Sequence, residues 1–206
     1  MFHIITSAAA AVTLAGWFSS SAPPAPPPVT MPPDEARFCS VLEKADATYE
    51  PLRKKWYAEK NGLTQETIGK QLDELVDKRN VEVLQILGGK KPHISEWAIR
   101  IEKISVSDLN FGKGSQKYIS LTGFFPCSLS VPFKAEPIPV SGAFTDFLAA
   151  RKVGDVVALT ATLLPHDAAT NPPQKAIEWS GFQGSSVEEP EYHGIVERLS
   201  DYVPPS

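Results

Sequence analysis

The spacing of apolar residues along the chain changes from a helical period to a strand period near residue 93. Before this point, apolar residues recur every three or four positions over residues 38–56 and again over 64–87, which is the pattern of amphipathic helices. An Asn-Gly pair lies between the two segments and a Gly-Gly pair follows the second, and both are helix-ending signals. The short connection predicts an antiparallel helical hairpin over residues 34–89.

Two positions affect how these helices begin and continue. Pro51 lies inside the apolar stripe of the first helix, where proline removes a backbone hydrogen bond. We expect the helix either to kink at Pro51 or to break near Tyr49 and restart with the proline in its first turn. For the second helix, Thr64 is the expected N-cap, because its hydroxyl oxygen can accept a hydrogen bond from a first-turn amide.

From residue 93 onward, apolar and polar residues alternate, as they do in half-buried strands. In the first strand, the apolar side changes parity between Ile101 and Ile104, which predicts a β-bulge that lets the strand bend. Apolar residues at helical spacing predict a short helix within residues 142–151, between the third and fourth strands. The same alternation places the four later strands at residues 118–124, 129–134, 155–164 and 176–182.

The end of the chain fits two structures. Tyr192, Ile195, Val196 and Leu199 match both the helical period and a bulged closing strand, and we prefer the strand. The element order strand, strand, strand, helix, strand, strand is that of the OB-fold, a five-stranded barrel. We therefore predict an α+β protein with an N-terminal helical hairpin followed by a small five-stranded OB-like β-barrel over residues 90–206.

Four stretches carry a resemblance to a known group of proteins: FCSVLEKADATY, KRN, SEWAIRIEKI and ARKVGDVVALTATL. Together they resemble small exported bacterial proteins of OB-like fold. In these proteins a helical segment precedes a first strand that bears Trp and a fourth strand that follows a Gly-Asp turn. The resemblance covers residues 38–182. It implies the fold more than the function, because such proteins largely have no assigned activity.

The N-terminus has the composition of an export signal. Residues 1–22 contain an apolar run of about 15 residues, which suits the h-region of a signal peptide and is shorter than the ~20 residues of a membrane span. Residues 23–33 are rich in proline and are expected to form an extended tether. We expect a periplasmic or secreted protein, either cleaved from its signal or anchored to a membrane by it. An alanine-rich start of a cytosolic protein is the alternative.

The chain has two cysteines, Cys39 in the first predicted helix and Cys127 near the third predicted strand. An even number of cysteines in an exported protein is typical of a disulfide, which here would join the hairpin to the barrel. The alternative is that both cysteines are small buried apolar residues.

Charge and motifs argue against several functions. The net charge is −4 and neither region has an excess of basic residues, which argues against nucleic acid as the main partner. The sequence has no G-x-S-x-G elbow, no phosphate-binding loop and no pair of histidines or cysteines at metal-ligand spacing. We expect no metal and no cofactor. Carboxylates brought together by folding would leave a hydrolase-like enzyme as an alternative.

OB-folds bind ligands on the exposed face of strands two and three and through two adjacent loops. On this face the sequence offers hydroxyl, aromatic and basic side chains: Tyr118, Ser120 and Thr122 from the second strand, Phe111, Lys113 and Lys117 from one loop, and His166 from the other. Such side chains suit an oligosaccharide or a single-stranded nucleic acid. We predict an exported, non-enzymatic binding or interaction module for an unknown protein or envelope ligand. A single-stranded nucleic-acid-binding OB-fold is the further alternative.

Overall fold

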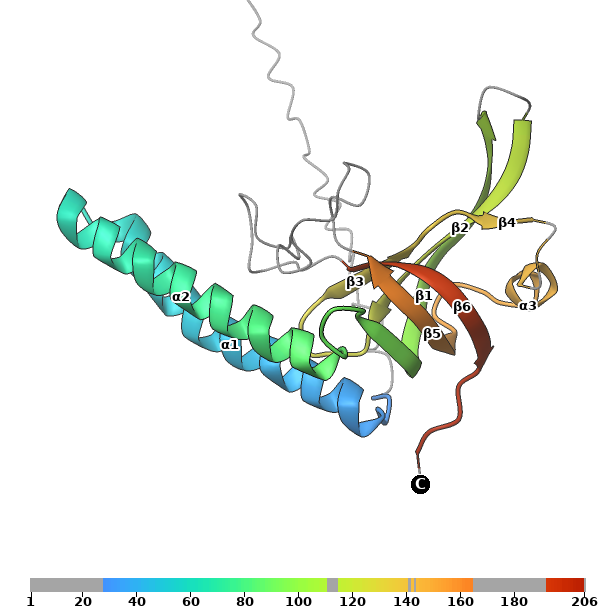
Figure 1. The fold of residues 1–206 in the computed structure, drawn as a ribbon, viewed down its shortest axis with the longest axis horizontal. Helices are drawn as coiled ribbons and strands as arrows, with labels where there is room; N and C mark the ends of the chain where they lie inside the picture. Colours follow the sequence, from blue (N-terminus) through green and yellow to red (C-terminus); the bar gives the residue numbers. More distant parts are fainter. Residues whose placement is uncertain (1–27, 111–114, 141, 143, 165–191, 206) are drawn as a thin grey trace, which may run out of the picture.

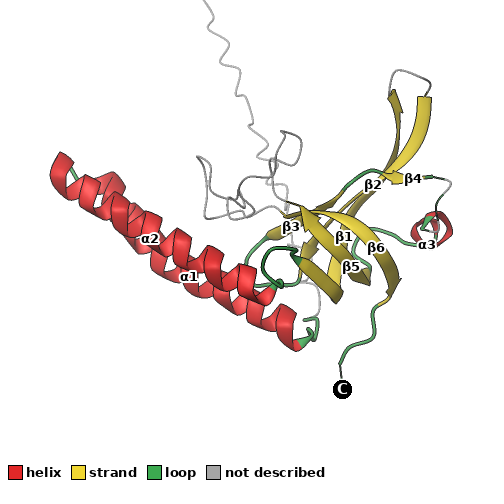
Figure 2. Ribbon diagram, viewed as in Figure 1, coloured by secondary structure: helices red, strands yellow, loops and turns green. Residues whose placement is uncertain are grey.

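The computed structural model describes residues 28–110, 115–140, 142, 144–164 and 192–205. Two long helices form an arm that projects from a β-barrel (Figure 1), and Figure 2 shows the same division into helices and strands. No helix within these described ranges is both long and apolar enough to cross a membrane.

The arm consists of α1 at Pro33–Ala58 and α2 at Gly62–Ile86, which confirms the predicted hairpin. α1 continues without interruption through Pro51, so the predicted break near Tyr49 is wrong. Pro51 is exposed, and water can therefore bind the backbone carbonyl that the proline leaves without an amide partner. Packing against α2 stabilises the helix along its length, so the loss of one hydrogen bond does not interrupt it.

The start of α2 also differs from the prediction. The side-chain oxygen of Asn61 accepts hydrogen bonds from the backbone amides of Leu63 at 3.0 Å and Thr64 at 3.3 Å. Asn61 is thus the N-cap, and Thr64 lies inside the first turn. Asparagine is among the strongest N-cap residues, and it comes first along the chain. At the other end, Gly88 and Gly89 adopt positive φ, and the helix ends there as the glycines indicated.

Six strands and a short helix follow. They are β1 His93–Asn110, β2 Ser115–Phe125, β3 Val131–Ala135, β4 Ile138–Pro139, α3 Thr145–Ala149, β5 Val156–Leu164 and β6 Tyr192–Asp201. The first four predicted strands and the short helix are confirmed, with small shifts at their ends. The C-terminal segment is a strand, as preferred, whereas the predicted strand 176–182 lies outside the described residues.

Five of the strands close a barrel in the order β1-β5-β6-β3-β2, with β2 paired back to β1. β3 and β6 are parallel and the other barrel pairs are antiparallel, which confirms an OB-like arrangement. The short β4 lies outside the barrel and pairs with β2. β1 pairs with β5 along its first half and with β2 along its second half. The register shifts between Ile101 and Lys103, so the predicted bulge is confirmed.

The first half of α1 and the last half of α2 pack against one end of the barrel, and we call this contact the helix–barrel junction. The ring centroid of Phe38 in α1 lies 5.0 Å from that of Trp97, 5.6 Å from Phe125 and 5.3 Å from Tyr192. All four side chains are buried. The other halves of the two helices extend away from the barrel (Figure 1). α1 therefore closes this end of the barrel with aromatic rings.

A disulfide joins α1 to the barrel at the junction. The sulfur atoms of Cys39 and Cys127 are 2.00 Å apart, and their Cα atoms are 5.1 Å apart. Cys127 lies in the turn between β2 and β3. The two cysteines are 88 residues apart in the sequence, so the bond links the two structural regions of the chain.

One carboxyl group is enclosed in the junction. Glu35 of α1 has 0% exposed surface, and its Oε2 accepts a hydrogen bond from the backbone amide of Ala98 in β1 at 2.8 Å. Its Oε1 has no hydrogen-bond partner among the described residues. Burial raises the pKa of Glu35 to about 8, against the opposing effect of the hydrogen bond from Ala98. The side chain is therefore mostly protonated at neutral pH.

Candidate functional site

The outward face of β1 and β2 carries a row of hydroxyl groups. Cross-strand pairing places Ser105 beside Ser120 and Ser107 beside Tyr118, and Thr122 follows on the same side of β2. The residues of β2 that alternate with them point into the core and are buried. We call these five residues the hydroxyl strip.

Hydrogen bonds orient two of the hydroxyls. Thr122 Oγ1 donates to Glu102 Oε2 at 3.2 Å, and the Tyr118 hydroxyl donates to Gln116 Oε1 at 2.9 Å. The two serines at the centre of the strip are half-buried. Because the strip belongs to paired strands of a closed barrel, its backbone is fixed before any ligand arrives, which lowers the entropy cost of binding.

The structure brings together three of the predicted site residues, all within the strip: Tyr118, Ser120 and Thr122. Lys117 is exposed and pairs with Asp108 of β1. Side chains alternate along a strand, so Lys117 lies on the opposite side of β2 from the strip and is not part of this face. The remaining predicted residues lie outside the described residues: Phe111, Lys113 and His166.

Three basic residues flank the strip and were missed by sequence reasoning. Lys103 of β1 and Lys134 of β3 both pair with Thr122 and are exposed. Arg100 lies further along β1, is half-buried and pairs with Phe124. Cross-strand neighbours depend on register, which a single sequence does not show. Phe124 did have a sequence signal, because it continues the two-residue spacing of the strip.

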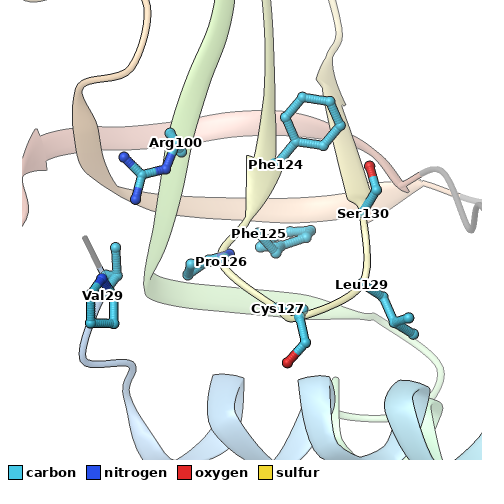
Figure 3. A pocket seen from close by; sticks show the side chains of 10 residues that line it. Val29, Arg100, Phe124, Phe125, Pro126, Cys127, Leu129 and Ser130 are labelled. Carbon is cyan, nitrogen blue, oxygen red and sulfur yellow. The ribbon is translucent and has the colours of Figure 1, made fainter. Parts of the chain in front are cut away.

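A pocket of about 400 Å³ opens beside Arg100 and Phe124, where β2 turns into β3. Its walls come from β1, the end of β2, the following turn and the segment before α1 (Figure 3). Among the described residues that line it, Arg100 alone carries a charge. The pocket therefore adds a mostly apolar recess to the polar strip.

A second polar cluster lies on β1, β5 and β6. His93 Nε2 lies 3.3 Å from Glu197 Oε2, and Thr162 Oγ1 donates to Glu197 Oε1 at 2.5 Å. The hydrogen bond from Thr162, followed by that with His93, lowers the pKa of the exposed Glu197 carboxyl group. The threonine binds the carboxylate and not the imidazole, so the order differs from that of a nucleophile–histidine–carboxylate relay.

Two further observations concern titratable groups in the described part of the chain. Within the described ranges, no three His, Cys, Asp or Glu side chains come together as metal ligands. Glu35 has a raised pKa but no exposed surface, so a substrate does not reach it. The described part of the chain therefore gives no support to the hydrolase-like alternative.

Comparisons of the chain with protein-family models, with curated proteins and with solved structures give no match. The function is therefore inferred from the chemistry of the strip and the pocket themselves.

Proposed function

We propose that the protein is an exported, non-enzymatic binding module whose hydroxyl strip contacts a ligand of the cell envelope. One observation carries this proposal. The hydroxyl groups of the strip are in register on one outward face, beside Lys103 and Lys134, with a pocket nearby. OB-folds bind extended ligands, including oligosaccharides, on the corresponding face.

The strip suits a ligand with many hydroxyl groups and some negative charge. A hydroxyl side chain both donates and accepts hydrogen bonds, and the flanking lysines can form charge-assisted hydrogen bonds with anionic groups. The ring of Tyr118 adds an apolar surface with a polar end. Envelope glycans combine these features. The net charge of −4 makes a nucleic acid the weaker choice.

Two features support the exported location. Residues 1–22 contain an apolar run of signal-peptide length, and the disulfide between Cys39 and Cys127 is of a kind that persists in oxidising compartments. Intact mass spectrometry of soluble and membrane fractions tests the location. A soluble chain shortened by about 15–22 residues, or a full-length chain in the membrane fraction, would support export. A full-length soluble chain with free thiols would contradict it.

Binding is tested by sedimentation of the purified protein with isolated cell envelopes. Ser120→Glu places a negative charge at the centre of the strip. The matched variant Ser200→Glu places the same charge at a half-buried position of β6, which is separated from β2 by β3. We expect Ser120→Glu to weaken binding about tenfold or more, because it repels anionic groups and removes a hydroxyl contact. Ser200→Glu should change it less than about twofold.

Equal binding by the two variants and the unmodified protein would contradict the proposal. Binding to single-stranded DNA that weakens steeply with salt would instead favour the nucleic-acid alternative.

A further inference from the structure

The pocket beside the strip is lined in part by apolar side chains. Phe124, Pro126 and Leu129 contribute from the end of β2 and the turn after it, and Pro28 and Val29 contribute from the segment before α1. Its volume of about 400 Å³ is within the range of small-ligand sites, about 300–1,000 Å³. These walls suit an apolar group of a ligand.

Arg100 places a positive charge beside these apolar side chains. In Figure 3 its guanidinium group lies at the same end of the view as Val29, and Ser130 lies at the opposite end. Its Nη1 donates to the carbonyl oxygen of Gly154 at 3.3 Å, which helps to orient the group. A guanidinium has five N–H donors in a planar fork that matches a carboxylate. Because these donors can serve more than one acceptor at once, Arg100 can bind a carboxylate in addition to its existing partners.

The walls of the pocket are held in place by contacts with other elements. Cys127 is joined to α1 by the disulfide, and the backbone amide of Ser128 donates to Glu43 Oε1 of α1 at 2.9 Å. The hydroxyl of Tyr202 donates to the carbonyl oxygen of Thr30, which holds the segment before α1. The pocket is therefore formed before a ligand arrives, and binding requires little additional ordering of the chain.

We propose that this pocket binds the carboxylate end of a ligand whose adjoining group is apolar, with Arg100 as the charge partner. A peptide C-terminus with an apolar last side chain and a small aryl acid share this chemistry. The inference rests on the proposed binding role, but it concerns the pocket and not the hydroxyl strip. Either the pocket proposal or the strip proposal can therefore be refuted while the other stands.

Two pairs of probes test the proposal on the purified protein. One pair is phenylacetate and its neutral amide, phenylacetamide. The other is a blocked tripeptide that ends in phenylalanine, with a free or an amidated C-terminus. Binding is followed by the backbone amide shifts of Cys127, Ser128 and Ser130. We expect saturable shifts with at least one carboxylate, and binding about tenfold or more weaker for its amide, because the charge-assisted hydrogen bonds are lost.

Variants separate the pocket from general charge attraction. Arg100→Gln should weaken carboxylate binding about tenfold, whereas Lys117→Gln, at an exposed position of β2 outside both the strip and the pocket lining, should change it less than about twofold. Ser130→Trp changes an exposed residue and fills the pocket without removing Arg100. Ser130→Trp should abolish carboxylate binding. This variant tests the pocket if Arg100→Gln does not fold.

The pattern of binding identifies the source of the ligand. Tripeptide binding supports a peptide C-terminus, and binding of phenylacetate alone supports a small acid. Equal affinity for charged and neutral probes would overturn the proposal, as would equal weakening by Lys117→Gln and Arg100→Gln. Absence of saturable shifts with both carboxylates at concentrations up to about 10 mM would also overturn it. If pocket binding is found but Ser120→Glu leaves envelope binding unchanged, the strip proposal fails and the pocket proposal stands.

Discussion

The helix–barrel junction and the hydroxyl strip belong to the same barrel but differ in what their side chains contact. At the junction, Phe38 packs among three aromatic rings and Glu35 is enclosed against β1. In the strip, hydroxyl and basic side chains face outward from strands whose other side forms the core. The chain's own helix thus occupies one end of the barrel. This comparison is consistent with our proposal that a ligand binds on the outside of the barrel.

The largest expected effect is at the centre of the junction. Phe38→Ala removes a buried ring that contacts three others. We expect the free energy of unfolding to fall by about 3–5 kcal/mol, because the substitution loses apolar burial and leaves a cavity. Chemical denaturation measures the loss. A change below about 1 kcal/mol would mean that the aromatic cluster does not hold the hairpin on the barrel.

The next largest loss of unfolding free energy is expected on removal of the disulfide. Replacing both Cys39 and Cys127 by serine removes a crosslink between residues 88 positions apart. We expect a loss of about 2–4 kcal/mol in unfolding free energy, since the unfolded chain gains conformational freedom. The matched control is the unmodified protein in reductant, which should show a similar loss. Equal stability of oxidised and reduced protein would contradict a structural role for the bond.

The buried carboxyl group predicts a pH effect. The folded protein holds the pKa of Glu35 at about 8, whereas the usual pKa of this carboxyl group is 4.5. Between these two pH values the folded chain therefore keeps a proton that the unfolded chain releases. The stabilisation is therefore complete below pH 4.5 and is lost as pH rises through about 8. The unfolding free energy should fall by up to about 1.4 kcal/mol for each pH unit between these limits.

Glu35→Gln is the control for this pH effect, because the amide fills a similar volume and does not titrate. Stability curves at several pH values should lose most of their slope in this variant. An unchanged slope would assign the pH dependence to other groups.

The smallest effect is expected at the far end of the arm. Leu63 is 79% exposed, whereas Leu42 at the junction is 2% exposed. Leu63→Ala should change the unfolding free energy by less than about 0.5 kcal/mol, and Leu42→Ala should lower it by about 2–5 kcal/mol. Thermal and chemical denaturation of this pair compare the same substitution in the two places. Similar losses would show that the exposed end packs against something in solution.

The hairpin and the barrel were predictable because periodicity reports which side of a local segment is buried. Periodicity alone is insufficient where two nearby residues can both cap a helix, or where the exposure of a proline decides whether the helix continues through it. Asn61 and not Thr64 is the N-cap, because its side-chain oxygen accepts hydrogen bonds from the first-turn amides. Pro51 is tolerated because it is exposed. Burial of Glu35 had no sequence signal, since a charged residue in the first turn of a helix is ordinarily exposed.

The site was predictable only where it follows one strand. Alternation along β2 identified three members of the strip, whereas Lys117 was grouped with them by its position in the sequence and lies on the other side of β2. The pocket combines Val29, Arg100 and Ser130 from distant parts of the chain. No local pattern relates such residues, because their proximity depends on strand register and on the docking of α1.

The most direct measurement is the mapping of backbone amide shifts in the purified protein as solubilised envelope glycan is added. We expect saturable shifts at Ser105, Ser120 and Thr122 in the strip, with the amides of Phe38 and Ala98 at the junction unchanged. Shifts confined to the junction or to β6, or no saturable shift in the strip, would contradict the proposal that this outward face binds an envelope ligand.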